Sequence, residues 1–231
     1  VLALARYFHG GSMEDIRRPA FLIAPLLIVA APAVFILRQP DLGTAIMLIA
    51  AGGAVLFAVG VRLWKFAIVL AAGLGAMPVV WSMLRPYQQR RIYTFLDPES
   101  DPLGAGYHIL QSKIALGSGG LFGKGLGQGL QSQLGFVPEV HTDFIFAILA
   151  EEIGFVGAIC ILMLYLLVLM RLIRIAGKAR DRVGILLITG VTSLIFFHVA
   201  INVSMTLGIV PPIGIPLPLL SYGGSSTITT F

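Results

Sequence analysis

FIFAILAEEIGFVGAICILMLYLLVLM, residues 144 to 170, is the stretch that decides the fold. About 20 consecutive apolar residues let a helix cross a bilayer, and the only charged residues here are Glu151 and Glu152, about two turns inside. A short, strongly basic segment with a single acid follows, and its cations are Arg171, Arg174, Lys178, Arg180 and Arg182. Because cytoplasmic loops of membrane proteins are enriched in lysine and arginine, this segment is predicted to lie in the cytoplasm.

The composition of the whole chain also indicates a membrane protein. Of its 231 residues 57% are hydrophobic and 12% are charged, with a mean hydropathy of +0.93, whereas about 25% of residues in a soluble domain are charged. A chain this apolar cannot hide its surface in one soluble core, so the bilayer must be its solvent. The net charge of +5 follows from the same cytoplasmic bias and does not call for a nucleic-acid partner. The single cysteine, Cys160, excludes an internal disulfide and argues against a cysteine-based zinc site.

Four further apolar stretches predict membrane-spanning helices, at residues 19–37, 44–61, 66–84 and 183–207. With residues 144–170 they predict an all-α integral membrane protein, a polytopic helical bundle of about five complete spans. Residues 1–8 and 225–231 are typical of partial helices, so we expect the sequence to be an internal fragment of a larger protein. We treat residues 1–231 as a single transmembrane domain.

Alternation of the spans assigns each loop to one side of the membrane. The loops at residues 6–18 and 62–65 fall on the cytoplasmic side, and both are basic, as that side requires. The same alternation places the turn around Asp41 and the whole of residues 85–143 outside. This large external loop is too long to be a structureless connection.

A short amphipathic helix at the membrane surface is predicted for residues 107–116 of the external loop. The side chains expected to face lipid or protein are Ile109, Leu110, Ile114 and Leu116. Those expected to face water are Gln111, Ser112 and Lys113. Seven glycines between residues 117 and 129 allow the next stretch of backbone to turn sharply or to approach a ligand closely.

Three acids stand close together earlier in the external loop: Asp97, Glu99 and Asp101, with a proline after each aspartate. Asp-Pro is common turn chemistry, so one interpretation is a solvated acidic turn. The other is a carboxylate general base, which must lie within hydrogen-bond reach of the hydroxyl that it deprotonates. A rigid turn on an external loop can place a carboxylate in that way, and spacing alone leaves both interpretations open.

A second polar group, PEVHTD at residues 138–143, precedes the 144–170 span and contains Glu139, His141 and Asp143. A helix N-terminus explains it, because caps and acids are favoured there. A metal site is the alternative, but the three side chains lack the close spacing of known ligand sets.

Two further candidates lie inside predicted spans. Glu151 is either a functional group, as ionisable residues within membranes often are, or the partner of a cation on a neighbouring helix. His198, Asn202 and Thr206 lie four residues apart and therefore share one helix face. That face predicts either interhelical hydrogen bonds or the wall of a hydrophilic cavity.

Arginines on the predicted outer side form another group: Arg38, Arg90 and Arg91, with Asp41 close to the first. Guanidinium groups can bind phosphate or pyrophosphate bidentately. Snorkelling to the membrane interface is the simpler explanation for any single one of them.

Several motifs stand in collinear order over essentially the whole chain. They are QPDLG at 39–43, DPESDPLGAGYH at 97–108, QSKIA at 111–115, PEVHTDFIFA at 138–147, EEIG at 151–154 and PLLSYGGSS at 218–226. Together they are highly specific and resemble the SEDS family of shape, elongation, division and sporulation proteins. Within that family, the sequences of residues 97–102 and 111–113 resemble the RodA branch more than the FtsW branch.

The resemblance implies a peptidoglycan glycosyltransferase with about ten membrane helices in the bacterial cytoplasmic membrane. Such enzymes polymerise lipid II, a disaccharide-pentapeptide linked to undecaprenyl pyrophosphate, at the outer face of that membrane during cell elongation. In this family the aspartate of Asp-Pro-x-Gly-x-Gly-Tyr is proposed to act as the base on the acceptor sugar. That residue is Asp101 here, and we rank Asp97 second.

The other candidates are predicted to bind substrate: Arg38, Asp41, Arg90, Arg91, Lys113, Glu139, His141, Asp143, Glu151 and Ser221. No cofactor is certain, although a divalent cation, Mg²⁺ or Mn²⁺, could assist the departure of pyrophosphate as a Lewis acid. The implied partners are lipid II, membrane lipid, a class B penicillin-binding protein that supplies the transpeptidase, and elongation-machinery proteins. The family's Gln-Pro-Ser-Glu stretch would precede Val1, so we expect part of the lipid II site to lie outside this sequence.

Two other functions stay open at this point. A flippase of lipid-linked precursors needs a polar path through the bilayer, which the His198 face with Glu151 and Glu152 could supply. A membrane scaffold for a partner transpeptidase needs no chemistry of its own.

Overall fold

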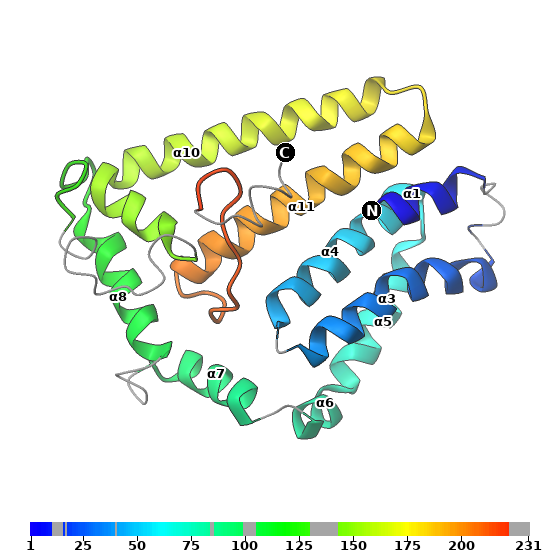
Figure 1. The fold of residues 1–231 in the computed structure, drawn as a ribbon, viewed down its shortest axis with the longest axis horizontal. Helices are drawn as coiled ribbons and strands as arrows, with labels where there is room; N and C mark the ends of the chain where they lie inside the picture. The colour runs from blue at the N-terminus through cyan, green and yellow to red at the C-terminus, as the bar shows by residue number, and fades with distance from the viewer. Residues whose placement is uncertain are drawn as a thin grey trace. The chain divides into compact units, whose positions relative to one another are not determined.

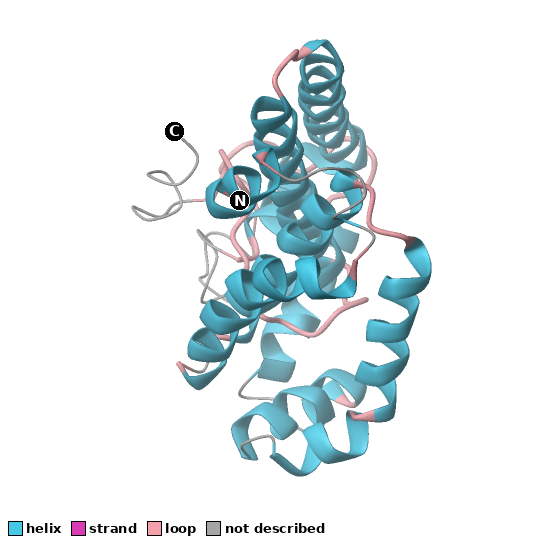
Figure 2. Ribbon diagram, turned by 90° about the vertical axis from the view of Figure 1, so that its right-hand side faces the viewer, coloured by secondary structure: helices cyan, strands magenta, loops and turns pink. Residues whose placement is uncertain are grey.

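The computed structural model describes residues 1–10, 16, 18–39, 41–83, 86–98, 105–129 and 143–221. Within these ranges the chain forms helices joined by loops, without strands (Figures 1 and 2), which confirms the all-α prediction. The chain divides into two compact units. Unit 1 comprises residues 1–84 and 168–197, and unit 2 comprises residues 85–167 and 198–231. The assignment of the whole chain to a single domain stays a prediction.

Unit 1 begins with the elements α1 (Leu2–His9), η1 (Pro19–Leu22), α3 (Ile23–Arg38) and α4 (Leu42–Val59). The turn before α4 is fixed by Asp41, which occupies the N-cap position. Its Oδ1 accepts a hydrogen bond from the Thr44 amide at 3.0 Å, and its Oδ2 accepts one from the Thr44 hydroxyl at 2.6 Å. This cap satisfies an amide that has no partner within the helix.

The buried core of unit 1 joins α1 to α4. Leu4 and Phe8 of α1 belong to one cluster with Val55 and Val59 of α4. Close approach of α3 and α4 depends on Gly52, because a Cβ there would lie 2.6 Å from Cγ2 of Val29. Small residues commonly permit such contacts between membrane helices, where no hydrophobic force drives association.

The predicted span at residues 66–84 is divided in the structure into α5 (Leu63–Gly75) and α6 (Met77–Met83). The 13 residues of α5 fall short of the roughly 20 that cross a bilayer as one helix. Pro78, in the first turn of α6, lacks the amide hydrogen that would continue α5. Apolar composition predicted this segment, and the break follows from one proline beside Gly75.

Unit 2 contains α7 (Pro86–Leu96), α8 (Ala105–Ser118), the first part of α10 (Ile145–Lys178), the last part of α11 (Arg182–Thr206) and the loop after α11. The two long helices continue into unit 1. α7 was not expected from the sequence, since residues 85–106 were interpreted as loop.

Four helical segments of the described chain are long and apolar enough to cross a membrane: residues 20–38, α4, α10 and α11. The most apolar 18-residue segment of α10 is only 17% buried, compared with 44% for that of α4. Because large side chains such as Leu164 and Leu167 of α10 are exposed, most of the surface of α10 is apolar. A helix with such a surface is stable only in lipid or against other apolar protein.

The helix predicted for residues 107–116 is present as α8, with bounds Ala105–Ser118, and its position at the membrane surface stays a prediction. Ser112 was predicted to face water, and this prediction was wrong, because Ser112 is fully buried beside Ile109 and Ala115. Ile114, predicted to face lipid or protein, is 51% exposed. Small residues at a spacing of three allow that face to pack closely. Burial of Ser112 costs little, because its hydroxyl donates to the Ile109 carbonyl at 3.0 Å.

Candidate functional site

α10 is interrupted at Gly154, where the backbone leaves the helical region with φ 72° and ψ −174°. In an unbroken helix the Phe155 amide would donate to the Glu151 carbonyl, and the Val156 amide to the Glu152 carbonyl. The interruption frees these four groups, and each of them is hydrogen-bonded to the loop that follows α8. Two lost helical hydrogen bonds are thus replaced by four others.

Loop residues 119–125 supply the matching groups. The two freed amides of α10 donate to the carbonyls of Gly120 and Leu121, at 2.9 and 3.1 Å. The amides of Lys124 and Gly125 donate to the two freed carbonyls, each at 3.0 Å. We call residues 119–125, together with the α10 residues to which they bond, the glycine seam. The seam ties the external loop to α10 through its backbone.

Glycine is required at two points of the seam because the two backbones touch. A Cβ on Gly119 would lie 2.1 Å from the Ala150 carbonyl oxygen, and a Cβ on Gly123 would lie 2.1 Å from the Glu152 carbonyl oxygen. Backbone oxygens of a helix cannot move aside as a flexible side chain can. Gly123 also has a φ of +80°, which residues with a side chain rarely adopt.

Replacing Gly119 with alanine is expected to open the seam and to destabilise the full-length protein by about 1–3 kcal/mol, the usual cost of overpacking. The matched control is Gly117→Ala, because nothing lies within 4 Å of a Cβ at Gly117. Thermal unfolding in detergent should separate the two variants, with a lower midpoint for Gly119→Ala alone. Equal midpoints would show that the seam does not form as described.

A buried ion pair lies beside the seam. The side chain of Glu151 is 0% exposed, and its Oε1 accepts a hydrogen bond from Nζ of Lys124 at 2.7 Å. Ser118 completes the cluster, with its hydroxyl 2.8 Å from the lysine Nζ and 3.3 Å from the same carboxylate oxygen. These contacts favour the ion-pair interpretation of Glu151. Its cation, however, comes from a glycine-rich loop and not from a neighbouring helix.

Asn202 of α11 joins two separate segments of unit 2. Its side chain is fully buried, and Nδ2 donates to the Asp143 carbonyl at 2.8 Å and to the Ile215 carbonyl at 2.7 Å. One amide group therefore ties Asp143, two residues before α10, to the proline-rich loop after α11. For Asn202 the structure supports the hydrogen-bonding interpretation of its helix face.

The loop after α11 is held by two further hydrogen bonds near its end. The hydroxyl of Tyr165, from α10, donates to the Pro218 carbonyl. The Leu217 amide donates to Oγ of Ser221 at 2.7 Å. Ser221 is almost buried, so its observed contact is internal to the loop, and its part in substrate binding stays a prediction.

The predicted catalytic residue, Asp101, lies outside the described residues, as do Glu99, Glu139 and His141. The chain is described again on both sides of Asp101, where α7 ends at Leu96 and α8 begins at Ala105. The predicted base is therefore only a few residues from two helix ends.

Arg90 and Arg91 lie within α7, but their side chains fall outside the described part of the chain. Asp97 follows α7 directly and is exposed, and its amide donates to the Tyr93 carbonyl at 2.9 Å. Lys113 is exposed on α8 and lies against Gly208, where a Cβ would be 2.2 Å from its Cε. The structure thus places these candidates on two helices or at a helix end, and their roles stay predictions.

Arg38 and Asp41 both belong to unit 1, at the exposed turn between α3 and α4. Asp41 acts as the helix cap described above, so this residue has a structural role whether or not it also meets substrate. Asp143 belongs to unit 2, where its Oδ2 would lie 3.5 Å from a Cβ placed on Gly214. The structure brings Asp143 and Ser221 into one hydrogen-bonded region through Asn202 and the loop 207–221.

Sequence reasoning missed Lys124, Ser118 and Tyr165. For Lys124 a signal existed, because it is the only charged residue among the seven glycines of residues 117–129. A lone cation on such a stretch needs either water or a buried acid. Nothing in the sequence singles out Ser118 or Tyr165, since the acid that Ser118 contacts lies 33 residues away and the carbonyl that Tyr165 contacts lies 53 residues away.

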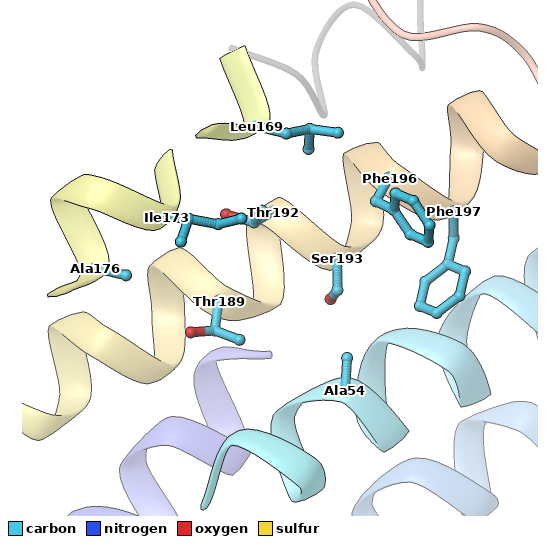
Figure 3. Close-up of a pocket in the computed structure, with 9 residues that line it drawn as sticks. All are labelled: Ala54, Leu169, Ile173, Ala176, Thr189, Thr192, Ser193, Phe196 and Phe197. Atoms are coloured by element: carbon cyan, nitrogen blue, oxygen red, sulfur yellow. The ribbon is translucent and has the colours of Figure 1, made fainter. Parts of the chain in front are cut away.

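Unit 1 contains a cavity of about 390 Å³ between side chains of α4, α10 and α11 (Figure 3). Its apolar walls include Ala54, Leu169, Ile173, Phe196 and Phe197. The hydroxyls that line it donate to carbonyls of their own helix; they belong to Thr189, Thr192 and Ser193. The cavity therefore suits an apolar group and offers no charged side chain for chemistry.

Among the described residues, no three histidine, cysteine, aspartate or glutamate side chains lie together in a way that could hold a metal ion. The expected divalent cation accordingly has no ligand set in this part of the chain, and no chemical step is assigned to it below.

Comparison with known sequences identifies the family of the chain. Residues 1–231 match the profile of the cell cycle protein family FtsW/RodA/SpoVE. The peptidoglycan glycosyltransferase MrdB of Escherichia coli is 50% identical over 206 residues, which are 88% of this chain and 55% of that protein. The probable peptidoglycan glycosyltransferase FtsW of Aliivibrio salmonicida is 43% identical over 223 residues, 95% of this chain and 54% of that protein. The chain thus spans about half the length of the curated relatives that it matches.

Two solved structures are also similar. One, described as the structural coordination of polymerization and crosslinking by a peptidoglycan synthase complex, matches with a TM-score of 0.78 and 32% identity over 99% of this chain and 62% of that chain. The rod shape determining protein RodA of Thermus thermophilus matches with a TM-score of 0.63 and 28% identity, over 99% of this chain and 57% of that chain. With the four spanning helices, these relatives indicate a multi-pass protein of the bacterial inner membrane. The chain therefore belongs to the FtsW/RodA/SpoVE family of cell cycle proteins, the SEDS family that its motifs resemble.

Proposed function

We propose that the full-length protein is a peptidoglycan glycosyltransferase that polymerises lipid II at the outer face of the cytoplasmic membrane during cell elongation. The observation that carries the proposal is the 50% identity to MrdB over 88% of this chain, together with the intact DPESDPLGAGYH motif at residues 97–108. The basic loops support it as well, because the charge bias predicts an external position for that motif, as polymerisation of a lipid-linked donor at the outer face requires.

In the proposed reaction Asp101 is the general base. Its carboxylate takes the proton from a hydroxyl of the acceptor sugar, and the hydroxyl oxygen forms the new bond to the anomeric carbon of the donor. The bond from that carbon to undecaprenyl pyrophosphate breaks, and the pyrophosphate leaves with the electron pair. A base positioned in this way contributes about 10²- to 10⁴-fold to a rate.

The structural contribution of the described residues is to fix α8, the helix that follows Asp101 in the sequence. α8 begins four residues after Asp101, and the loop after α8 is fixed to α10 by the glycine seam and the Lys124–Glu151 pair. A catalytic group gains from such restriction, because small displacements from the productive geometry cost rate. The candidate phosphate-binding groups, Arg90 and Arg91, precede the same segment on α7.

Two partners and a cofactor belong to the proposal. A class B penicillin-binding protein would crosslink the glycan made here, and elongation-machinery proteins would direct both enzymes. The similarity to a peptidoglycan synthase complex that coordinates polymerization and crosslinking supports the first. A divalent cation that neutralises the departing pyrophosphate would need ligands beyond the described residues.

The proposal is tested with purified full-length protein in liposomes that contain fluorescent lipid II. Formation of long glycan strands is expected, and the partner transpeptidase should not be needed for bonds to form. Movement of labelled lipid II between leaflets without any glycan would instead establish the flippase. If neither activity appears until a transpeptidase is added, and only crosslinking then rises, the scaffold is the correct function.

A further inference from the structure

The tip of the loop after α8 exposes three large apolar side chains. Leu121 is 63% exposed, Phe122 81% and Leu126 76%. The charged residue between them, Lys124, is turned the other way, with its ammonium group in the ion pair with Glu151. The tip therefore presents apolar surface without the cation that the sequence places in its middle.

This tip is rigid, so its exposure is a feature of the fold. The glycine seam fixes the backbone of Leu121 by a hydrogen bond from Val156, and that of Lys124 by its bond to Glu151. The amide of Gly123 donates back to the Gly119 carbonyl at 2.8 Å. The Gly125 amide is bonded to Glu152 as well, and each backbone group bonded inside the protein lowers the cost of bringing irregular backbone close to hydrocarbon.

The depth of the tip follows from counting along α10. Arg171 is the first charged residue after Glu152 and marks the cytoplasmic end of the apolar span. A hydrocarbon layer of about 30 Å takes about 20 helical residues, which leads back from Arg171 to Glu151. Phe155 and Val156, to which the tip is bonded, then lie about one turn inside the outer boundary of that layer.

The apolar surface of the tip is also continuous with the lipid-facing surface of α10. Phe155 is 59% exposed, Val156 46% and Ile159 42%. The seam bonds Leu121 directly to Val156. The apolar surroundings that these side chains of α10 require therefore extend to the tip.

We propose that residues 121–126 form an anchor that inserts into the outer leaflet of the membrane, with Leu121, Phe122 and Leu126 among the upper parts of phospholipid acyl chains. The ion pair with Glu151 offsets the charge of Lys124 that would otherwise oppose insertion. Because α8 ends at Ser118, just before this anchor, insertion holds the C-terminal end of α8 close to the membrane surface. The inference concerns lipid contact and does not depend on the proposed enzymatic activity.

The test places a single tryptophan at Phe122 in the full-length protein, after every native tryptophan, including Trp64 and Trp81, has been replaced by phenylalanine. The protein is reconstituted alone in phosphatidylglycerol–phosphatidylethanolamine vesicles whose acyl chains are brominated either near the headgroup or near the methyl end. We expect the fluorescence of the tryptophan in Phe122→Trp to be quenched more strongly by bromine near the headgroup than by bromine near the methyl end. Iodide in the buffer should quench this fluorescence at least about twofold more weakly than it quenches free N-acetyltryptophanamide.

Met163→Trp, on the exposed apolar side of α10 about two turns beyond Val156, is the matched control and should favour bromine near the methyl end. Leu126→Trp is a second reporter, and neither tip substitution disturbs packing because both side chains are exposed. Iodide quenching equal to that of the free compound would overturn the proposal. Shielding from iodide without quenching by bromine would overturn it too, because a second protein copy would then cover the tip.

Discussion

Replacing Asp101 with asparagine in the full-length protein is expected to slow lipid II polymerisation by about 10²- to 10⁴-fold, the usual contribution of a positioned general base. Asparagine keeps the size of the side chain but cannot accept the proton of the acceptor hydroxyl. The loss should appear in kcat, with little change in KM, because the base acts on the transition state. A fluorescent lipid II assay that resolves glycan length measures both constants.

Asp97→Asn is the matched control for this prediction. Asp97 has the same side chain and is also followed by proline, but it lies outside the family pattern and sits directly at the end of α7. We expect a change of less than about tenfold in its kcat, attributable to the shape of the turn. Full activity in Asp101→Asn, or a larger loss in Asp97→Asn, would move the base to Asp97.

Replacing Lys124 with methionine is expected to destabilise the full-length protein by about 3–5 kcal/mol, because it leaves the buried carboxylate of Glu151 without its cation. The reverse change, Glu151→Gln, should cost less, since the Lys124 side chain is 29% exposed and can turn its ammonium group to water. The midpoint of thermal unfolding in detergent should therefore fall more for the lysine variant than for the glutamate variant.

The double variant Lys124→Met/Glu151→Met distinguishes the contribution of the ion pair to stability from that of the packing around it. Removing both charges is expected to restore most of the stability, because apolar residues of similar volume often replace a buried ion pair without loss. Glu152→Gln is the control for a charge change at the neighbouring position, where the side chain is only partly buried, and should shift the midpoint little. A double variant no more stable than Lys124→Met would mean that the pair does not account for the loss.

The membrane helices could be predicted from the sequence because length and hydropathy determine them almost alone. The apolar run at residues 183–207 became α11 at Arg182–Thr206. Hydropathy does not register the positions where a helix breaks, however. Pro78 divided one predicted span, and Gly154 interrupted another, although glycines are frequent in membrane helices and Gly157 of the same helix is accommodated within it.

The candidate site was predictable only to the extent that its contacts are local. The cap at Asp41 involves a residue three positions away, and a capping pattern can be recognised in a sequence. The partner of Glu151 is 27 residues away, so the choice between a functional acid and an ion pair had to await the structure. Ser112 shows the same limit, because which face of α8 is buried depends on what packs against it.

The order of Lys124 and Glu151 along the chain has a consequence for biosynthesis. Lys124 precedes Glu151 by 27 residues, so the ribosome releases the cation first, and the predicted topology has it delivered across the membrane before α10 enters the insertion machinery. When the acidic start of α10 reaches the far side of the bilayer, the counter-charge and the glycine loop are already there to receive it. The reverse order would leave a carboxylate waiting at the edge of the hydrocarbon layer.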